Sequence, residues 1–62
     1  MTPDAIRLLR ATLRETTVTF GARLAVSSRT VEDWEQGRRH PRGLTLRTLQ
    51  DLATRHRIDA TA

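Results

Sequence analysis

The apolar residues near the start of the chain recur every three or four positions, which is the spacing of a buried stripe on an α-helix. The stripe consists of Ile6, Leu9 and Leu13. Thr2 and Pro3 precede it, and threonine is a common N-cap residue while proline suits the first helical position. The pattern therefore predicts an amphipathic helix that begins at Pro3. A neighbouring stripe carries Arg7, Arg10 and Arg14.

The next segment, residues 16–24, gives conflicting signals. It is rich in β-branched residues and contains Gly21, and propensity alone favours a strand there. Phe20 and Leu24 are four residues apart, however, and a lone short strand would have no partner in a chain of 62 residues. We therefore expect a short helix over about residues 17–24, held by packing rather than by propensity.

A third helix is expected over about residues 28–36. The serines at positions 27 and 28 supply an N-cap, Val31 and Trp34 form an apolar pair three residues apart, and Gly37 is placed as a C-cap glycine. The second and third helices are joined by a three-residue turn near Ala25, and arginines flank the third helix. This arrangement describes a helix-turn-helix.

A loop of Arg, Gly and Pro over residues 37–43 leads to a last amphipathic helix, in which Leu46, Leu49, Leu52 and Ala53 recur at helical spacing. The sequence thus predicts an all-α fold, a compact bundle of four short helices in one domain over residues 1–58. Residues 59–62 have nothing to bury and are expected to fray. The predicted core comprises Ile6, Leu9, Leu13, Phe20, Leu24, Val26, Val31, Trp34, Leu46, Leu49 and Leu52.

Composition narrows the function classes. The chain has 11 basic residues, all of them arginine, against 7 acidic ones, and no cysteine. No disulfide or thiolate metal site can form, and no apolar run approaches the ~18 residues of a membrane span. A net charge of +4 suits nucleic-acid binding, but it also suits simple solubility, because 29% charged residues is close to the globular average of about 25%.

At this point a family resemblance becomes specific. Residues 17–36 resemble the motif of the lambda-repressor-like (Cro/C1 or XRE) DNA-binding family, and the extension from Trp34 through Gly37 to Arg39 resembles the segment that follows its recognition helix. The similarity runs from about residue 6 to residue 53. The family's apolar positions are matched by Phe20, Leu24, Val26, Val31 and Trp34.

The resemblance implies structural roles for several residues. It implies an ion pair between Glu35 and Arg10 on the first helix, which would satisfy a carboxylate on the inner side of the third helix. The chain differs from the family pattern at three positions: Thr17 replaces a glutamine, Gly21 an alanine, and Ala25 a glycine. Many relatives dimerise through a fifth helix, for which only residues 56–62 remain here.

Helical geometry sorts the third helix into two faces. At about 100° per residue, Val31, Trp34 and Glu35 share one face, which we interpret as buried. The opposite face and the N-terminal tip are candidates for base contacts, because arginine can grip guanine and a carboxylate can accept from cytosine. The alternative is a solvated face with an i, i+4 pair between Arg29 and Asp33. The predicted base contacts are Ser28, Arg29, Glu32 and Asp33.

Residues around this helix are candidates for phosphate contacts, since arginines, hydroxyls and helix N-termini bind the DNA backbone. For the threonines, ordinary helix capping is an equal alternative. The predicted phosphate contacts are Thr16, Thr17, Thr19, Gln36, Arg38, Arg39 and Arg42. His40 and His56 have no second ligand at helical spacing, so no metal site and no cofactor are expected.

These observations favour a cytoplasmic, sequence-specific DNA-binding transcriptional regulator. We expect a homodimer on a two-fold symmetric double-stranded operator, acting as an autorepressor from a phage or mobile element. The alternative is an antitoxin or interaction module that neutralises a toxin or another partner protein. No nucleophile, base and acid lie at a meaningful spacing, so the protein is not expected to be an enzyme and no membrane association is expected.

Overall fold

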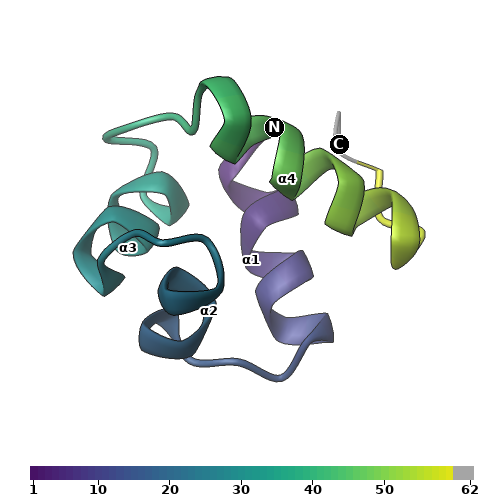
Figure 1. The fold of residues 1–62 in the computed structure, drawn as a ribbon, viewed down its shortest axis with the longest axis horizontal. Coiled ribbons are helices and arrows are strands. Elements are labelled where there is room, and N and C mark those ends of the chain that lie inside the picture. The colour runs from purple at the N-terminus through teal and green to yellow at the C-terminus, as the bar shows by residue number, and fades with distance from the viewer. Residues whose placement is uncertain (60–62) are drawn as a thin grey trace.

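Four α-helices make up the computed structural model, which describes residues 1–59 of the chain (Figure 1). The helices are α1 (Pro3–Thr12), α2 (Thr17–Arg23), α3 (Ser28–Glu35) and α4 (Gly43–Arg55). No strand occurs among these residues, so the all-α prediction is confirmed and packing overrides β-propensity in α2. No helix in this part of the chain is long and apolar enough to cross a membrane.

The C-terminal end of the described chain packs against the core at Ile58, the last residue of the predicted domain. Ile58 is half-buried and packs against the core, and its backbone N–H donates to the carbonyl oxygen of Ala53 at 2.8 Å. Residues 56–59 contain no fifth helix. The remainder of the predicted tail, residues 60–62, lies outside the described residues.

The first three helices begin at hydroxyl side chains. Thr2, Thr16 and Ser27 each accept a hydrogen bond from the backbone N–H three residues further on, at 3.1, 3.1 and 3.2 Å. These bonds satisfy donors that a helix N-terminus otherwise leaves without partners. The fourth helix has no such cap, because Arg42 occupies its N-cap position. The N-terminus of α4 therefore keeps its positive end uncapped.

All four helices end in the same hydrogen-bonding motif. In α3, the N–H of Gly37 donates to Trp34 and the N–H of Arg38 donates to Asp33, at 3.2 and 2.9 Å, which is the Schellman pattern. The residue in the left-handed region is Arg14, Ala25, Gly37 and Arg57 in turn, with φ of 56, 58, 77 and 57°. Only Gly37 adopts this conformation without strain. The predicted place of Arg14 on a helical stripe is wrong, since α1 ends before it.

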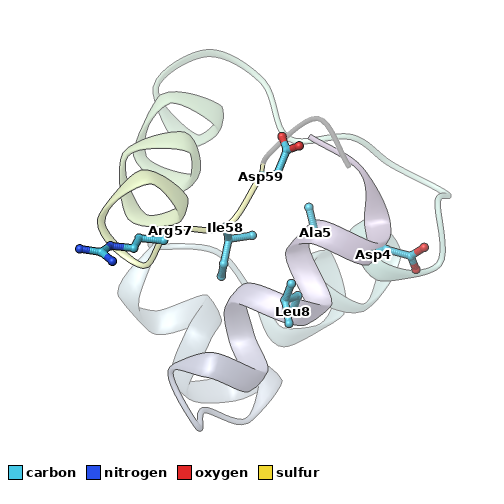
Figure 2. Close-up of a pocket in the computed structure, with 6 residues that line it drawn as sticks. All are labelled: Asp4, Ala5, Leu8, Arg57, Ile58 and Asp59. Carbon is cyan, nitrogen blue, oxygen red and sulfur yellow. The ribbon is translucent and has the colours of Figure 1, made fainter.

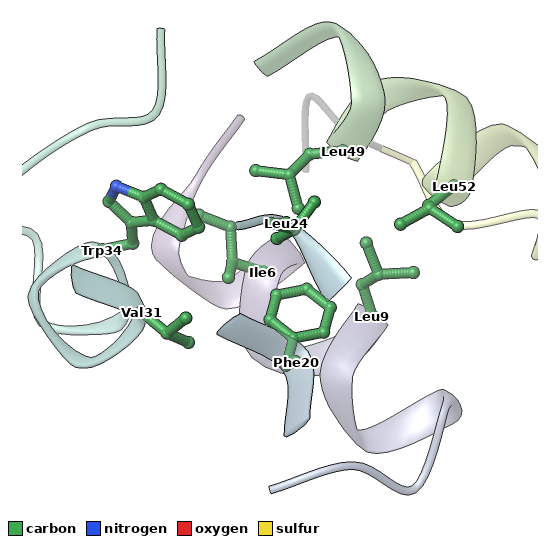
Figure 3. Packing of buried hydrophobic residues seen from close by; sticks show 8 residues of the cluster. All are labelled: Ile6, Leu9, Phe20, Leu24, Val31, Trp34, Leu49 and Leu52. Carbon is green, nitrogen blue, oxygen red and sulfur yellow. The ribbon is translucent and has the colours of Figure 1, made fainter. Parts of the chain in front are cut away.

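A single core fills the space between the helices, and every helix contributes to it (Figure 3). Trp34 is only 4% exposed, so its indole anchors the core and is not a stacking platform for bases. Leu13 and Val26 are half-buried and pack against its edge. The buried side chains of the cluster are Ile6, Leu9, Phe20, Leu24, Val31, Trp34, Leu49 and Leu52.

Leu46 does not belong to this cluster and is only half-buried, which corrects its predicted core position. It lies in the first turns of α4, where the helix leaves the core. Leu44, two residues earlier, is 81% exposed. The core contacts of α4 come from its later turns, through Leu49 and Leu52.

The turn between α2 and α3 is unusually tight at Gly21. The carbonyl oxygen of Gly21 accepts from the N–H of Val26 at 2.9 Å. A Cβ atom at position 21 would lie 2.7 Å from the carbonyl oxygen of Val26, closer than real Cβ atoms approach a backbone atom. Gly21 is therefore required by the close packing of α2 against α3 in this chain.

Substitutions at Gly21 and Ala25 should change the stability of the fold in the direction opposite to that expected from the helix propensities of alanine and glycine. Gly21→Ala should destabilise the fold by about 1–3 kcal/mol, because the clash with Val26 outweighs a propensity gain of about 1 kcal/mol. Ala25→Gly should be neutral or stabilising by up to about 1 kcal/mol, because it relieves a positive φ. Urea unfolding followed by circular dichroism measures both changes. A stabilising Gly21→Ala would contradict this packing.

Candidate nucleic-acid interface

The third helix is held to the first by an ion pair with two hydrogen bonds. Arg10 Nε lies 2.6 Å from Glu35 Oε2, and Arg10 Nη2 lies 3.0 Å from Glu35 Oε1. The other terminal nitrogen of Arg10 donates to the carbonyl oxygen of Glu15 at 3.1 Å. Arg7 donates to the carbonyl oxygen of Glu35 as well. The C-terminal end of α3 is thus fixed to α1 through both the side chain and the backbone of one residue.

Burial makes this pair matter for stability. The Glu35 side chain is 10% exposed and that of Arg10 is 26% exposed. Hydrogen bonding to the Glu35 carboxylate raises the pKa of Arg10 above its ordinary value. The guanidinium is charged at every accessible pH, as arginine is in general. An unpaired carboxylate at this depth would be costly, whereas the bidentate pair satisfies it.

The outer side of α3 carries most of the predicted base contacts. Arg29, Glu32 and Gln36 are exposed, and Ser28 is half-buried at the N-terminal tip. The Arg29 side chain is 76% exposed, so most of it is open to solvent. These side chains are available to a ligand that approaches α3 from outside.

Asp33 is a correction to the predicted exposed face, because only 8% of this residue is exposed. The segment after α3 folds back over it, and the backbone N–H groups of Arg38 and Arg39 donate to its carbonyl oxygen at 2.9 and 3.3 Å. Its carboxylate is enclosed by Arg29, Arg38 and Arg39. Asp33 is therefore not available for the base contact that the helical wheel predicts, since the wheel places a residue relative to the core and ignores the following loop.

Three arginines share the Asp33 carboxylate. The shortest nitrogen–oxygen distances are 3.4 Å from Arg29, 3.8 Å from Arg38 and 3.7 Å from Arg39. The i, i+4 pair that sequence spacing offered as an alternative for Arg29 is thus present. The structure brings a predicted base contact together with two predicted phosphate contacts.

A basic hollow of about 320 Å³ lies beside this cluster. It is lined by Arg38, Arg39, His40 and Arg42, and no acidic side chain lines it. The uncapped N-terminus of α4 follows directly after Arg42 and adds the positive end of a helix dipole. The hollow has the charge and size to take a phosphate group.

A second hollow, of about 340 Å³, has different chemistry. Figure 2 shows Ala5 and Leu8 of α1 on one side and Ile58 facing them from the end of the chain. Its rim carries charges of both signs, so it has no preference for a polyanion. The lining residues are Asp4, Ala5, Leu8, Arg57, Ile58 and Asp59.

The predicted phosphate contacts at the start of α2 have local roles. The hydroxyl of Thr16 caps the helix and lies 3.2 Å from that of Thr19. Thr17 is half-buried. Capping, which sequence reasoning offered as an equal alternative, therefore occurs at Thr16. No three acidic or histidine side chains in the described residues gather as metal ligands would.

The ion pair between Glu15 and Arg23 gives no signal in the sequence. Arg23 Nε and Nη2 lie 3.0 and 2.7 Å from the two carboxylate oxygens of Glu15. The residues are eight positions apart and belong to no common helix, so no spacing rule identifies them. Hydrogen bonding from Arg23 lowers the pKa of Glu15 from its ordinary value.

The side chains of five further arginines have no hydrogen-bond or ion-pair partner within residues 1–59. They are Arg14, Arg42, Arg47, Arg55 and Arg57.

Comparisons with protein-family models, curated proteins and solved structures found no match to the chain. Function is therefore inferred from the geometry of this chain and from the family resemblance of residues 17–36.

Arg10 and Glu35 should be energetically coupled. Arg10→Met and Glu35→Gln should each destabilise the fold, because each leaves a partly buried polar group without its partner, and the double variant should cost less than the sum by about 1–3 kcal/mol. Urea unfolding of the four proteins gives the coupling energy. As a control, Arg47→Met, which removes an exposed arginine, should combine additively with Glu35→Gln. Coupling below about 0.3 kcal/mol for the Arg10 pair would contradict its structural role.

The Glu15 pair should make stability depend on pH. Since Arg23 lowers the pKa of Glu15 below its ordinary value of 4.5, the folded protein binds this proton less readily than the unfolded chain. The stabilisation is present above pH 4.5 and is lost as the pH falls through the folded-state pKa. Urea unfolding over a pH series should show Arg23→Gln less stable than the wild type at neutral pH, with the difference shrinking in acid. A constant difference would show that the pair contributes no pH dependence.

Proposed function

We propose that this protein is a sequence-specific DNA-binding transcriptional regulator that acts as a homodimer on a two-fold symmetric operator. The observation that carries the proposal is the meeting of Arg29 from α3 with Arg38 and Arg39 from the following loop around one carboxylate. A group able to read bases and groups able to hold the backbone thereby share one surface. The resemblance of residues 17–36 to the lambda-repressor-like family supports the same function.

In this proposal α3 enters the major groove with its exposed face. Arg29 has the planar fork that grips guanine O6 and N7. Ser28 precedes it at the N-terminal tip, and Glu32 lies about one turn further along α3. Gln36 is exposed at the other end of α3. Trp34 and Val31 hold the helix from the inside, and the Arg10–Glu35 pair fixes its C-terminal end. The reading face is therefore presented on a rigid support.

The arginines of the loop supply affinity and register. Arg38, Arg39 and Arg42 lie around the basic hollow, where a backbone phosphate would be surrounded by positive charge. Such contacts release counterions and carry no sequence information. Two protomers with three such arginines each would neutralise about six phosphates, which gives a slope of log K against log salt of about −5.

A two-fold operator follows from the homodimer, since each protomer reads one half-site about one helical turn from the other. The bound dimer would then occlude a promoter and repress transcription. For an autorepressor, this is the promoter of its own gene. This mode of action requires no cofactor and no catalytic group, and it suits the small regulators of phages and mobile elements.

The test begins by selecting the preferred duplex from a random pool and measuring binding to it and to a scrambled duplex over a salt series. Arg29→Ala should weaken operator binding about tenfold or more and random binding much less, because it removes a bidentate base contact. Arg39→Ala should weaken both duplexes alike and reduce the salt slope by about one per protomer. Fluorescence anisotropy measures all of these affinities.

Arg55→Ala is the matched control, because it removes the same charge from an exposed arginine at the far end of α4, roughly 18 Å along the helix from the basic hollow. It should leave the discrimination between duplexes unchanged. Equal losses for Arg29→Ala on both duplexes would make Arg29 a backbone contact only. Failure of the wild type to bind any duplex at low salt would contradict the proposed function and favour the partner-protein alternative.

A further inference from the structure

Asp33 occupies a central place in the basic surface that neither base reading nor phosphate binding explains. Its side chain is 12% exposed, yet the three arginine side chains around it are 62–76% exposed. A carboxylate beneath a surface that binds a polyanion lowers the overall attraction. Its presence there calls for a compensating role.

The geometry of the contacts indicates what that role is. The distances of 3.4–3.8 Å to the three arginines are longer than the 2.6 and 3.0 Å of the Arg10–Glu35 pair. Arg29 Nε donates a hydrogen bond to the carboxylate, whereas Arg38 and Arg39 approach it as ion pairs without a hydrogen bond. The three guanidinium groups are therefore drawn toward one point, and the terminal nitrogens of Arg29 stay free to donate elsewhere. The same residue also holds the loop backbone, because its carbonyl oxygen accepts from Arg38 and Arg39.

Charge balance supports this interpretation. Without the carboxylate, three positive groups would repel one another and spread over solvent, and each long side chain would regain rotamer freedom that binding must remove again. With it, Arg29 on α3 and the two loop arginines are tied to a common centre. The direction of Arg29 is thereby coupled to the position of the loop.

We propose that Asp33 is a positioning residue for DNA recognition: its carboxylate orients Arg29 for base reading relative to Arg38 and Arg39, and its charge weakens non-specific attraction to DNA. This inference rests on the proposed function. It means that discrimination between sequences depends on a side chain that touches no DNA.

Asp33→Asn tests the inference because it keeps the shape and removes the charge. Binding to the scrambled duplex should become about threefold tighter, since a negative charge near the phosphates is lost. Binding to the selected operator should become about tenfold weaker, since Arg29 loses its orientation. Discrimination thus falls about thirtyfold, with the two affinities moving in opposite directions. A purely structural role would weaken both.

Two further variants separate position from charge. Asp33→Glu keeps the charge and moves the carboxylate by one methylene group, so it should lower operator affinity and leave random affinity unchanged. It also serves if Asp33→Asn melts below the assay temperature. Asp51→Asn is the matched control, because it removes the same charge from an exposed position on α4 and should leave discrimination unchanged.

A thermodynamic cycle with Arg29→Ala completes the test. In that background Asp33→Asn should cause no further loss of discrimination, because no Arg29 side chain remains to be oriented. The inference is overturned if Asp33→Asn shifts both duplexes by the same factor, or if its loss of discrimination persists without Arg29. A wild type that binds no duplex overturns the proposed function itself, and selective wild-type binding with an inert Asp33→Asn overturns the inference alone.

Discussion

The bidentate contact between Arg10 and Glu35 is the interaction on which the rest of the structure depends. α3 has only eight residues, too few to be stable by itself, and its inner face offers two large apolar side chains to the core. The ion pair adds a directional connection at the end from which the arginine-rich loop departs. α2 packs closely against α3, and α1 fixes the end of α3 from which the loop begins.

Arginine serves two opposite purposes in this small protein. Arg10 lies against a nearly buried carboxylate and contributes to the fold, whereas Arg29 and Arg39 remain mostly exposed while they share Asp33. The difference lies in distance and burial. Short bidentate bonds hold a helix, whereas the longer contacts to Asp33 gather three side chains and occupy only one of their hydrogen-bond donors, Arg29 Nε. A chain too small for a large core therefore uses the same residue type to hold the helices together and to build its proposed DNA-binding surface.

Most of the fold could be predicted because it depends on local rules. Helical spacing indicates the packing of Phe20 and Leu24 even where propensity favours a strand. The surface contacts were less predictable, because they depend on how the loop after α3 folds back over that helix. Asp33 lies on the outer side of a helical wheel yet is buried by that loop, and the Glu15–Arg23 pair joins segments that no periodicity relates. Side-chain contacts between different helices and loops therefore become visible only in the three-dimensional structure.

The central claim is that the outer face of α3 and the arginine loop form one DNA-binding surface. The most direct measurement is amide chemical-shift mapping by NMR as the selected duplex is added to the ¹⁵N-labelled protein. The account predicts the largest shifts in residues 28–32 and 38–42, with little change at Leu8 and Ile58, which line the second hollow. Shifts concentrated around that hollow, or a spectrum unaltered by duplex DNA, would contradict it.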